Sequence, residues 1–146
     1  MKLMMNKTMI RGQQRARKIA LQALYQWHMS NYALNIIEEQ FYANNNMEKI
    51  DKDYFKKLLY EIPANIDVLK QQITPFLDRE LHDPIELTVL NIGTYELLYC
   101  TEIPYKVIID EAIILTKEFG SQDGYRYVNG VLNQIARQVR AQEITQ

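Results

Sequence analysis

Residues 11–30 read RGQQRARKIALQALYQWHMS, and their apolar side chains recur at steps of three and four residues. This period matches the turn of an α-helix and predicts one buried stripe, made of Ala16, Ile19, Ala20, Ala23, Leu24 and Trp27. Arg11, Arg15 and Lys18 follow the same spacing on another face, with Arg17 beside them. A single helix from near Arg11 to Ser30 is therefore expected to contribute apolar side chains to the core and positive charges to the surface.

The rest of the chain is patterned for helices as well, because 5 Gly and 4 Pro in 146 residues leave few breaks. About seven helices in all are predicted, which defines an all-α fold. The second helix is expected at residues 34–43, and the third is capped by Asp51 and ended or kinked at Pro63. The fourth begins at about residue 65, and the fifth begins at Asp83-Pro84. The sixth covers residues 104–119, and Asp123 caps the last helix. Gly93, inside the fifth helix, predicts close packing of another helix against it.

These helices are expected to form one domain over residues 11–142, preceded by a disordered basic tail at residues 1–10. Pro63 and Asn65 separate an N-terminal bundle, about 11–63, from a C-terminal bundle, about 65–140. No flexible linker and no internal repeat marks the division, so the two bundles are expected to pack as one unit.

Charge is divided unevenly along the chain. The first acidic residue is Glu38, and the six Lys and Arg before it give residues 1–37 a charge of +6. The remaining 11 Lys and Arg against 18 Asp and Glu give the rest −7. This polarity suggests an anion-binding arm on an acidic body, with a solvated basic helix face as the other interpretation.

Residues for catalysis or metal binding are sparse. The lone Cys100 is assigned to the core, and His28 and His82 have no partner ligand at helical spacing. No glycine-rich phosphate loop is present. We therefore expect no enzyme, no cofactor and no metal. The lack of an apolar signal segment or membrane-length run predicts a cytoplasmic protein without a membrane partner.

Several stretches carry a resemblance to a known family. They are residues 15–27, RARKIALQALYQW; residues 90–97, LNIGTYEL; residues 103–112, IPYKVIIDEA; and Phe119-Gly120 followed by residues 127–132, YVNGVL. In order and spacing from Arg11 to Arg140, the chain resembles the NusB family of bacterial transcription antitermination factors.

The resemblance implies two three-helix bundles plus an additional helix, and a role as an adaptor in transcription. Members of this family bind the boxA element of nascent ribosomal RNA together with NusE, a small-subunit ribosomal protein, and the complex helps RNA polymerase pass terminators. The implied partners are single-stranded boxA RNA, NusE and the RNA polymerase antitermination complex.

Cations hold the phosphates of single-stranded RNA, and planar groups stack on its bases. The expected contacts on the first helix are Lys7, Arg11, Gln14, Arg15, Arg17, Lys18 and Tyr25, the last also serving in part as core. The arginine-rich helix start of the family falls on residues 13–17, where Gln13 and Gln14 replace arginines. The electrostatic attraction should therefore be weaker here, and RNA affinity should depend more on NusE.

The resemblance implies a second RNA contact at the turn before the last helix, where a helix start offers backbone N–H groups to a phosphate. The matching residues are Asp123, Tyr125, Arg126, Tyr127 and Asn129. Core packing of Tyr127 and capping by Asp123 are equal alternatives. For the protein partner, the resemblance points to an acidic patch that includes Glu86 and faces basic NusE. A first-turn carboxylate that stabilises its own helix is the alternative for Glu86.

Two other functions remain open. The same helical domain resembles the N-terminal extension of some ribosomal RNA cytosine methyltransferases, as an RNA-binding accessory domain. That function requires a methyl-donor-binding domain with a catalytic cysteine, which we do not find in these 146 residues. A helical scaffold that binds only protein, as in a homodimer, predicts weak RNA affinity that is indifferent to sequence.

Overall fold

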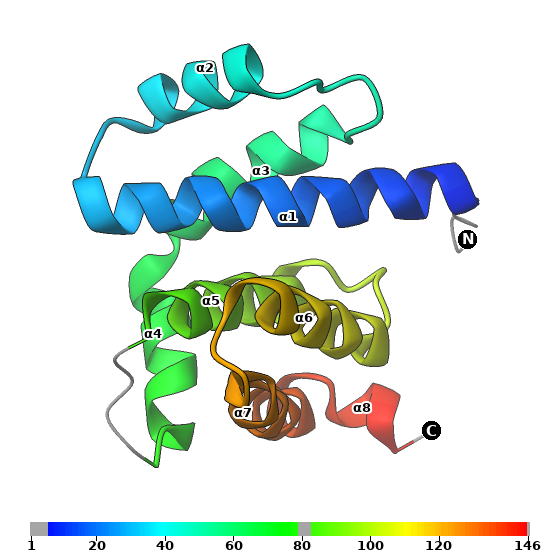
Figure 1. Ribbon diagram of the computed structural model, residues 1–146. Helices are drawn as coiled ribbons and strands as arrows, with labels where there is room; N and C mark the ends of the chain where they lie inside the picture. The colour runs from blue at the N-terminus through cyan, green and yellow to red at the C-terminus, as the bar shows by residue number, and fades with distance from the viewer. Residues whose placement is uncertain (1–5, 79–82, 146) are drawn as a thin grey trace. The chain divides into compact units, whose positions relative to one another are not determined.

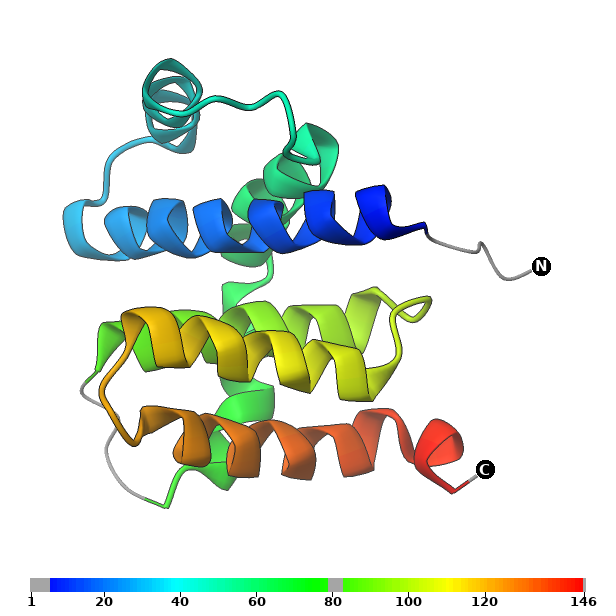
Figure 2. The ribbon, with the colours of Figure 1, turned by 45° about the vertical axis from the view of Figure 1, so that its right-hand side comes forward.

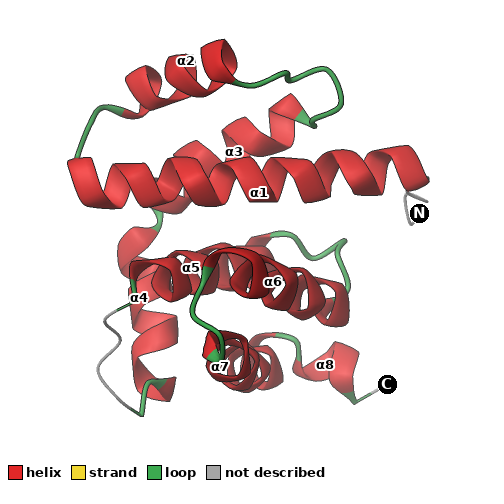
Figure 3. Cartoon of the chain, in the orientation of Figure 1, coloured by secondary structure: helices red, strands yellow, loops and turns green. Residues whose placement is uncertain are grey.

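A computed structural model describes residues 6–78 and 83–145, and helices joined by loops account for all of this part of the chain (Figures 1 and 3). It divides into two compact units, Met1–Ala64 and Asn65–Gln146. The first unit holds α1 (Lys7–Ser30), α2 (Leu34–Asn44) and α3 (Lys52–Ala64). The second holds α4 (Ile66–Ile73), the 3-10 turn η1 (Thr74–Phe76), α5 (Pro84–Tyr99), α6 (Tyr105–Phe119), α7 (Gly124–Val139) and α8 (Ala141–Ile144).

The all-α prediction is confirmed, with one short helix, α8, added to the predicted seven in the described residues. The single domain over residues 11–142 stays a prediction. None of the helices described is both long and apolar enough to cross a membrane. His82 lies outside the described residues.

The first helix starts earlier than predicted. The Asn6 side chain accepts a hydrogen bond from the Met9 backbone N–H at 2.9 Å and so caps the helix ahead of Lys7. The disordered tail predicted for residues 1–10 is therefore wrong for residues 7–10, while residues 1–5 lie outside the described part. At the other end, Asn31 adopts the left-handed conformation (φ 58°) and donates its N–H to the Trp27 carbonyl.

In the first unit, α1 packs against both α2 and α3 (Figure 1). Ala16, Ala20 and Ala23 of α1 are completely buried, and such small side chains let neighbouring helices approach closely. The predicted cap of α3 is confirmed, because Asp51 accepts a hydrogen bond from the Tyr54 N–H at 3.0 Å. The Asp51 N–H in turn donates to the Gly12 carbonyl at 3.1 Å, which fastens the loop before α3 to α1.

In the second unit, α5, α6 and α7 pack against one another and α4 packs on α5. Figures 1 and 2 show α6 and α7 side by side and antiparallel. The predicted close approach at Gly93 is confirmed, because a Cβ there would lie 2.8 Å from Leu132 Cδ1 of α7. Cys100 is fully buried, as predicted.

The C-terminal end of α5 is capped by Arg140, which follows α7 in the chain. The buried Arg140 guanidinium donates to the carbonyls of Leu97 (2.8 Å), Cys100 (3.0 Å) and Ile103 (2.9 Å). It also binds Glu143 of α8, at 2.6 Å, and Glu143 accepts the Tyr105 N–H at the start of α6. One ion pair thus satisfies backbone groups that two helix ends leave unpaired.

Candidate nucleic-acid interface

A row of polar residues follows one face of α1. Each residue of an α-helix is turned by about 100° from the last, so Lys7, Arg11, Gln14, Lys18 and Tyr25 fall within about 60° of one another. The three cations of this row are exposed, and Gln14 and Tyr25 are half-buried. We call these five residues together with Arg15, also exposed, the α1 basic face.

The α1 basic face begins at the positive end of a helix dipole. The first turn of α1 contains no acidic residue, although a carboxylate there would stabilise the helix. Lys7 and Arg11 place two further positive charges near that end. The arrangement repels cations and suits a polyanion, and it fits the function predicted for Lys7, Arg11, Gln14, Arg15, Lys18 and Tyr25.

Arg17 does not belong to this face, and the prediction that it contacts RNA is wrong for the free protein. Only two residues after Arg15, it is turned by about 200° from it, almost to the opposite side of the helix. Its side chain is 3% exposed, and the guanidinium lies 5.5 Å from the centroid of the Tyr54 ring. The sequence pattern placed Arg17 beside the other cations but did not show on which side of α1 its side chain lies.

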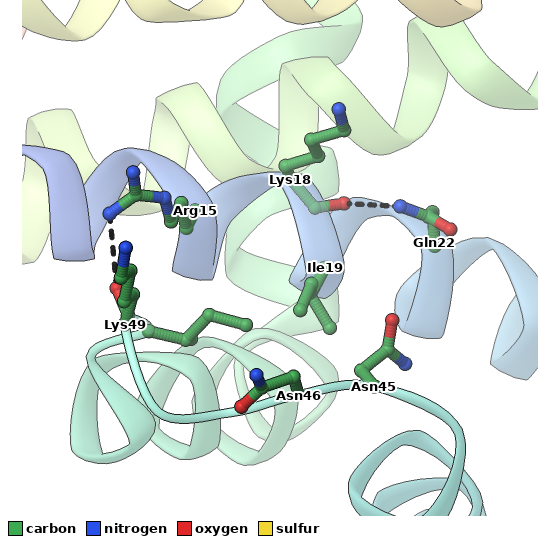
Figure 4. A pocket seen from close by; sticks show the side chains of 8 residues that line it. Arg15, Lys18, Ile19, Gln22, Asn45, Asn46 and Lys49 are labelled. Atoms are coloured by element: carbon green, nitrogen blue, oxygen red, sulfur yellow. Dashed lines mark hydrogen bonds between the residues drawn. The ribbon is translucent and has the colours of Figure 1, made fainter.

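A groove runs beside the α1 basic face, between α1 and the loop that leads into α3 (Figure 4). Its volume is about 350 Å³. It is lined by Arg15, Lys18, Ile19, Gln22, Asn45, Asn46, Lys49 and Ile50. Sequence reasoning missed the loop residues, since only the packing of α1 on α3 brings them beside α1.

A second group of cations lies where α6 ends and α7 begins. Tyr125 is half-buried, with Lys117 Nζ 4.6 Å and the Arg126 guanidinium 5.7 Å from its ring centroid. Arg126 Nε also donates to the Tyr125 hydroxyl at 3.1 Å, and this hydrogen bond raises the pKa of Arg126. We call Lys117, Tyr125 and Arg126 the α6–α7 corner. Lys117 was missed because it lies in the helix before the predicted turn.

The other residues predicted at this turn differ in how they are placed. Asp123 is exposed at the N-cap position of α7, but its side chain makes no capping hydrogen bond. Asn129 is half-buried, and its side-chain oxygen accepts from the Asn133 amide at 2.8 Å. Tyr127 is half-buried, so its exposure does not decide between packing in the core and contact with RNA. These three stay predictions as RNA contacts.

Glu86 is 3% exposed, which favours the alternative that its carboxylate stabilises the fold, and its contact with NusE stays a prediction. A Cβ on Gly124 would lie 3.0 Å from the Glu86 carboxyl carbon, which places this carboxylate against the first residue of α7. The first turn of α7 contains no acidic residue of its own. The carboxyl group of Glu86 therefore lies at the positive end of α7, where a carboxylate would stabilise that helix.

Within residues 6–78 and 83–145, no three His, Cys, Asp or Glu side chains lie close enough together to hold a metal ion. What the described residues do present is exposed cations on α1 and cations around an aromatic ring at the α6–α7 corner. Phosphates and bases of nucleic acid are the natural ligands of such groups. Fold and surface together define the class of all-helical proteins with nucleic-acid-binding surfaces.

Comparison with known proteins narrows that class to one family. The model of the NusB family matches residues 14–137, and the chain belongs to this family. The transcription antitermination protein NusB of Legionella pneumophila (strain Corby) is 60% identical over 143 residues, which cover 97% of each chain. The NusB of Hahella chejuensis (strain KCTC 2396) is 43% identical over 131 residues, 88% of each chain.

Solved structures agree with the fold. T. maritima NusB superposes with a TM-score of 0.72 at 28% identity, covering 86% of this chain and 91% of that one. A crystal structure of the antitermination factors NusB and NusE in complex with dsRNA superposes with a TM-score of 0.78 at 25% identity, covering 89% of this chain and 99% of that one. The resemblance drawn from the sequence motifs is thereby confirmed.

Proposed function

We propose that the chain is a transcription antitermination factor that binds the boxA element of ribosomal RNA transcripts together with NusE. Within the antitermination complex it helps RNA polymerase read through terminators. The observation that carries the proposal is the exposed row of cations on α1 in a chain 60% identical to a transcription antitermination protein NusB. A solved relative that holds both NusE and dsRNA supports the two classes of partner.

In this proposal the α1 basic face holds phosphates, and the α6–α7 corner contributes a cation and an aromatic ring to another part of the RNA. Single-stranded RNA is the expected form, because stacking on Tyr25 or Tyr125 requires an unpaired base. The protein acts by binding alone, as a cytoplasmic adaptor without catalysis.

The test is a titration of fluorescently labelled boxA RNA, a scrambled RNA of equal length and a boxA duplex, each with and without NusE. We expect boxA RNA to bind at least about tenfold more tightly than the scrambled RNA, a difference of about 1.4 kcal/mol. NusE should increase that preference. Equal affinity for the two single strands in the presence of NusE would overturn the proposal and favour a protein-only scaffold.

A further inference from the structure

The groove between α1 and residues 45–50 has the composition of a nucleotide site. Arg15 and Lys49 supply positive charge from its two sides, and none of its eight lining residues is acidic. Ile19 points from α1 toward the loop in Figure 4 but is 7% exposed, so the half-buried Ile50 offers the larger apolar surface. Its volume of about 350 Å³ lies within the range of small-ligand sites, roughly 300–1,000 Å³.

Amide groups add the means to read a base edge. Gln22, Asn45 and Asn46 line the groove, and each uses only one end of its amide in a hydrogen bond within the described residues. Gln22 and Asn45 donate to carbonyls, which leaves their side-chain oxygens as acceptors. Asn46 accepts from the Glu48 N–H, which leaves its NH₂ as a donor. Acceptors and donors beside an apolar wall are what an unstacked base requires.

The groove is held in shape before any ligand arrives. Arg15 Nη1 donates to the Lys49 carbonyl at 3.3 Å, and Asp51 N–H donates to the Gly12 carbonyl at 3.1 Å. Gly12 is buried, and a Cβ there would contact Asp51 N at 3.5 Å. A loop fixed in this way loses little conformational entropy on binding.

The groove also continues the α1 basic face, because Arg15 and Lys18 belong to both. In Figure 4 the Lys18 side chain points away from the loop. A strand whose phosphates follow α1 therefore passes the mouth of the groove.

We propose that this groove seats one unstacked nucleotide of the bound RNA, with its base against Ile50 and its phosphate near Arg15 and Lys49. The proposal rests on the proposed RNA-binding function and extends the contact from α1 to residues 45–50, which were not predicted to touch RNA.

The test compares the wild type with Gln22→Ala/Lys49→Ala in titrations of boxA RNA that carries several flanking nucleotides. Neither side chain supports the fold, since Gln22 bonds only within its own helix and Arg15 binds the backbone of Lys49, which alanine retains. We expect roughly five- to twentyfold weaker binding and a logarithmic salt slope shallower by about 0.7. Lys70→Ala/Gln71→Ala, on exposed positions of α4, is the matched control and should bind like the wild type.

Two further arms identify the ligand. RNA substituted with 4-thiouridine should crosslink to residues 45–50 of the wild type, whereas a boxA duplex should bind the wild type and the groove variant equally. Uridine monophosphate at equal concentration should not displace the strand.

If the wild type prefers boxA RNA but the groove and control variants bind it alike, the nucleotide site is wrong and the proposed function stands. If the wild type shows no preference for boxA RNA, the function itself fails.

Discussion

Arg140 links the end of α5 and the loop after it to α8 in the second unit. Its guanidinium is the shared donor for carbonyls at the end of α5 and in the loop after it, and Glu143 balances its charge. An arginine fork suits this task because its donors are fixed in one plane, whereas a lysine offers a single flexible ammonium. Sequence analysis placed only the end of the last helix here, because the partners of Arg140 lie about 40 residues earlier in the chain.

Arg140→Ala should lower the free energy of unfolding by about 3 kcal/mol, since it leaves several buried carbonyls unsatisfied. Arg140→Lys should recover only part of this loss. Chemical denaturation followed by circular dichroism measures both, with the exposed Arg137→Ala as control. A loss in Arg140→Ala no larger than that in the control would contradict the role given to the guanidinium.

Glu38 joins α2 to α3 in the first unit. Its two carboxylate oxygens accept hydrogen bonds from the Tyr42 and Tyr60 hydroxyls, each at 2.7 Å. Burial raises the pKa of Glu38, but the hydrogen bonds from Tyr42 and Tyr60 and the charge of Lys56 outweigh it, so the pKa is lowered overall. Burial and the bond to Glu38 raise the pKa of Tyr42 to about 12, and the bond and burial raise that of Tyr60 to about 12.

Because the folded pKa of Glu38 lies below the unfolded one, its stabilising effect is complete above the unfolded value of about 4.3 and is lost as pH falls through the folded value. Glu38→Gln should therefore lower stability near pH 7, and its difference from the wild type should shrink below about pH 4. Urea denaturation at both pH values tests this, with Glu39→Gln as the neighbouring control. A difference independent of pH would show that packing, and not the carboxylate charge, matters at residue 38.

At the scale of elements, the crossing of α5 and α7 depends on Gly93. A side chain there meets Leu132, which is fully buried and has little room to move. Gly93→Ala should destabilise the protein by about 1–3 kcal/mol, although alanine favours a helix by about 1 kcal/mol. In α7, Gly130 is exposed and a Cβ there would meet no atom within 4 Å apart from its chain neighbours and the adjacent backbone of its own helix, so Gly130→Ala should stabilise by up to about 1 kcal/mol. Thermal unfolding should show opposite shifts, and shifts of the same sign would contradict the close approach.

Sequence reasoning predicted elements well where the signal is local. The Asp51 and Asp83 caps act within a few residues of the helices they begin, and the structure has both of them. The sequence pattern did not predict burial where a side chain contacts a residue that is distant in the sequence. Glu86 and Arg17 read as surface charges but are buried, because Gly124 of α7 and Tyr54 of α3 are brought to them by folding.

For the molecule as a whole, the division of charge has the most direct consequence for function. Residues 1–37 carry +6 and the remainder −7, and the structure places three of the early cations in one exposed row with Arg15 beside it. Helical spacing in the sequence predicted Arg11, Arg15 and Lys18 of this face. It did not predict the groove beside it, whose walls come from residues about 30 positions apart. Because Arg17 is buried, this face offers one cation fewer to RNA, and the greater dependence of RNA affinity on NusE stays a prediction.

The most direct test of RNA binding by the α1 basic face is to measure how the affinity for boxA RNA depends on salt concentration. The measurement compares the wild type with Lys7→Ala/Arg11→Ala. Both residues are exposed and lie outside the groove, and Lys57→Ala/Lys70→Ala removes the same charge from other exposed positions. A handful of phosphate contacts predicts a logarithmic slope of roughly −2 to −4 for the wild type, reduced in magnitude by about 1.4 in the α1 variant and unchanged in the control. An unchanged slope in Lys7→Ala/Arg11→Ala would contradict the binding of RNA by the α1 basic face.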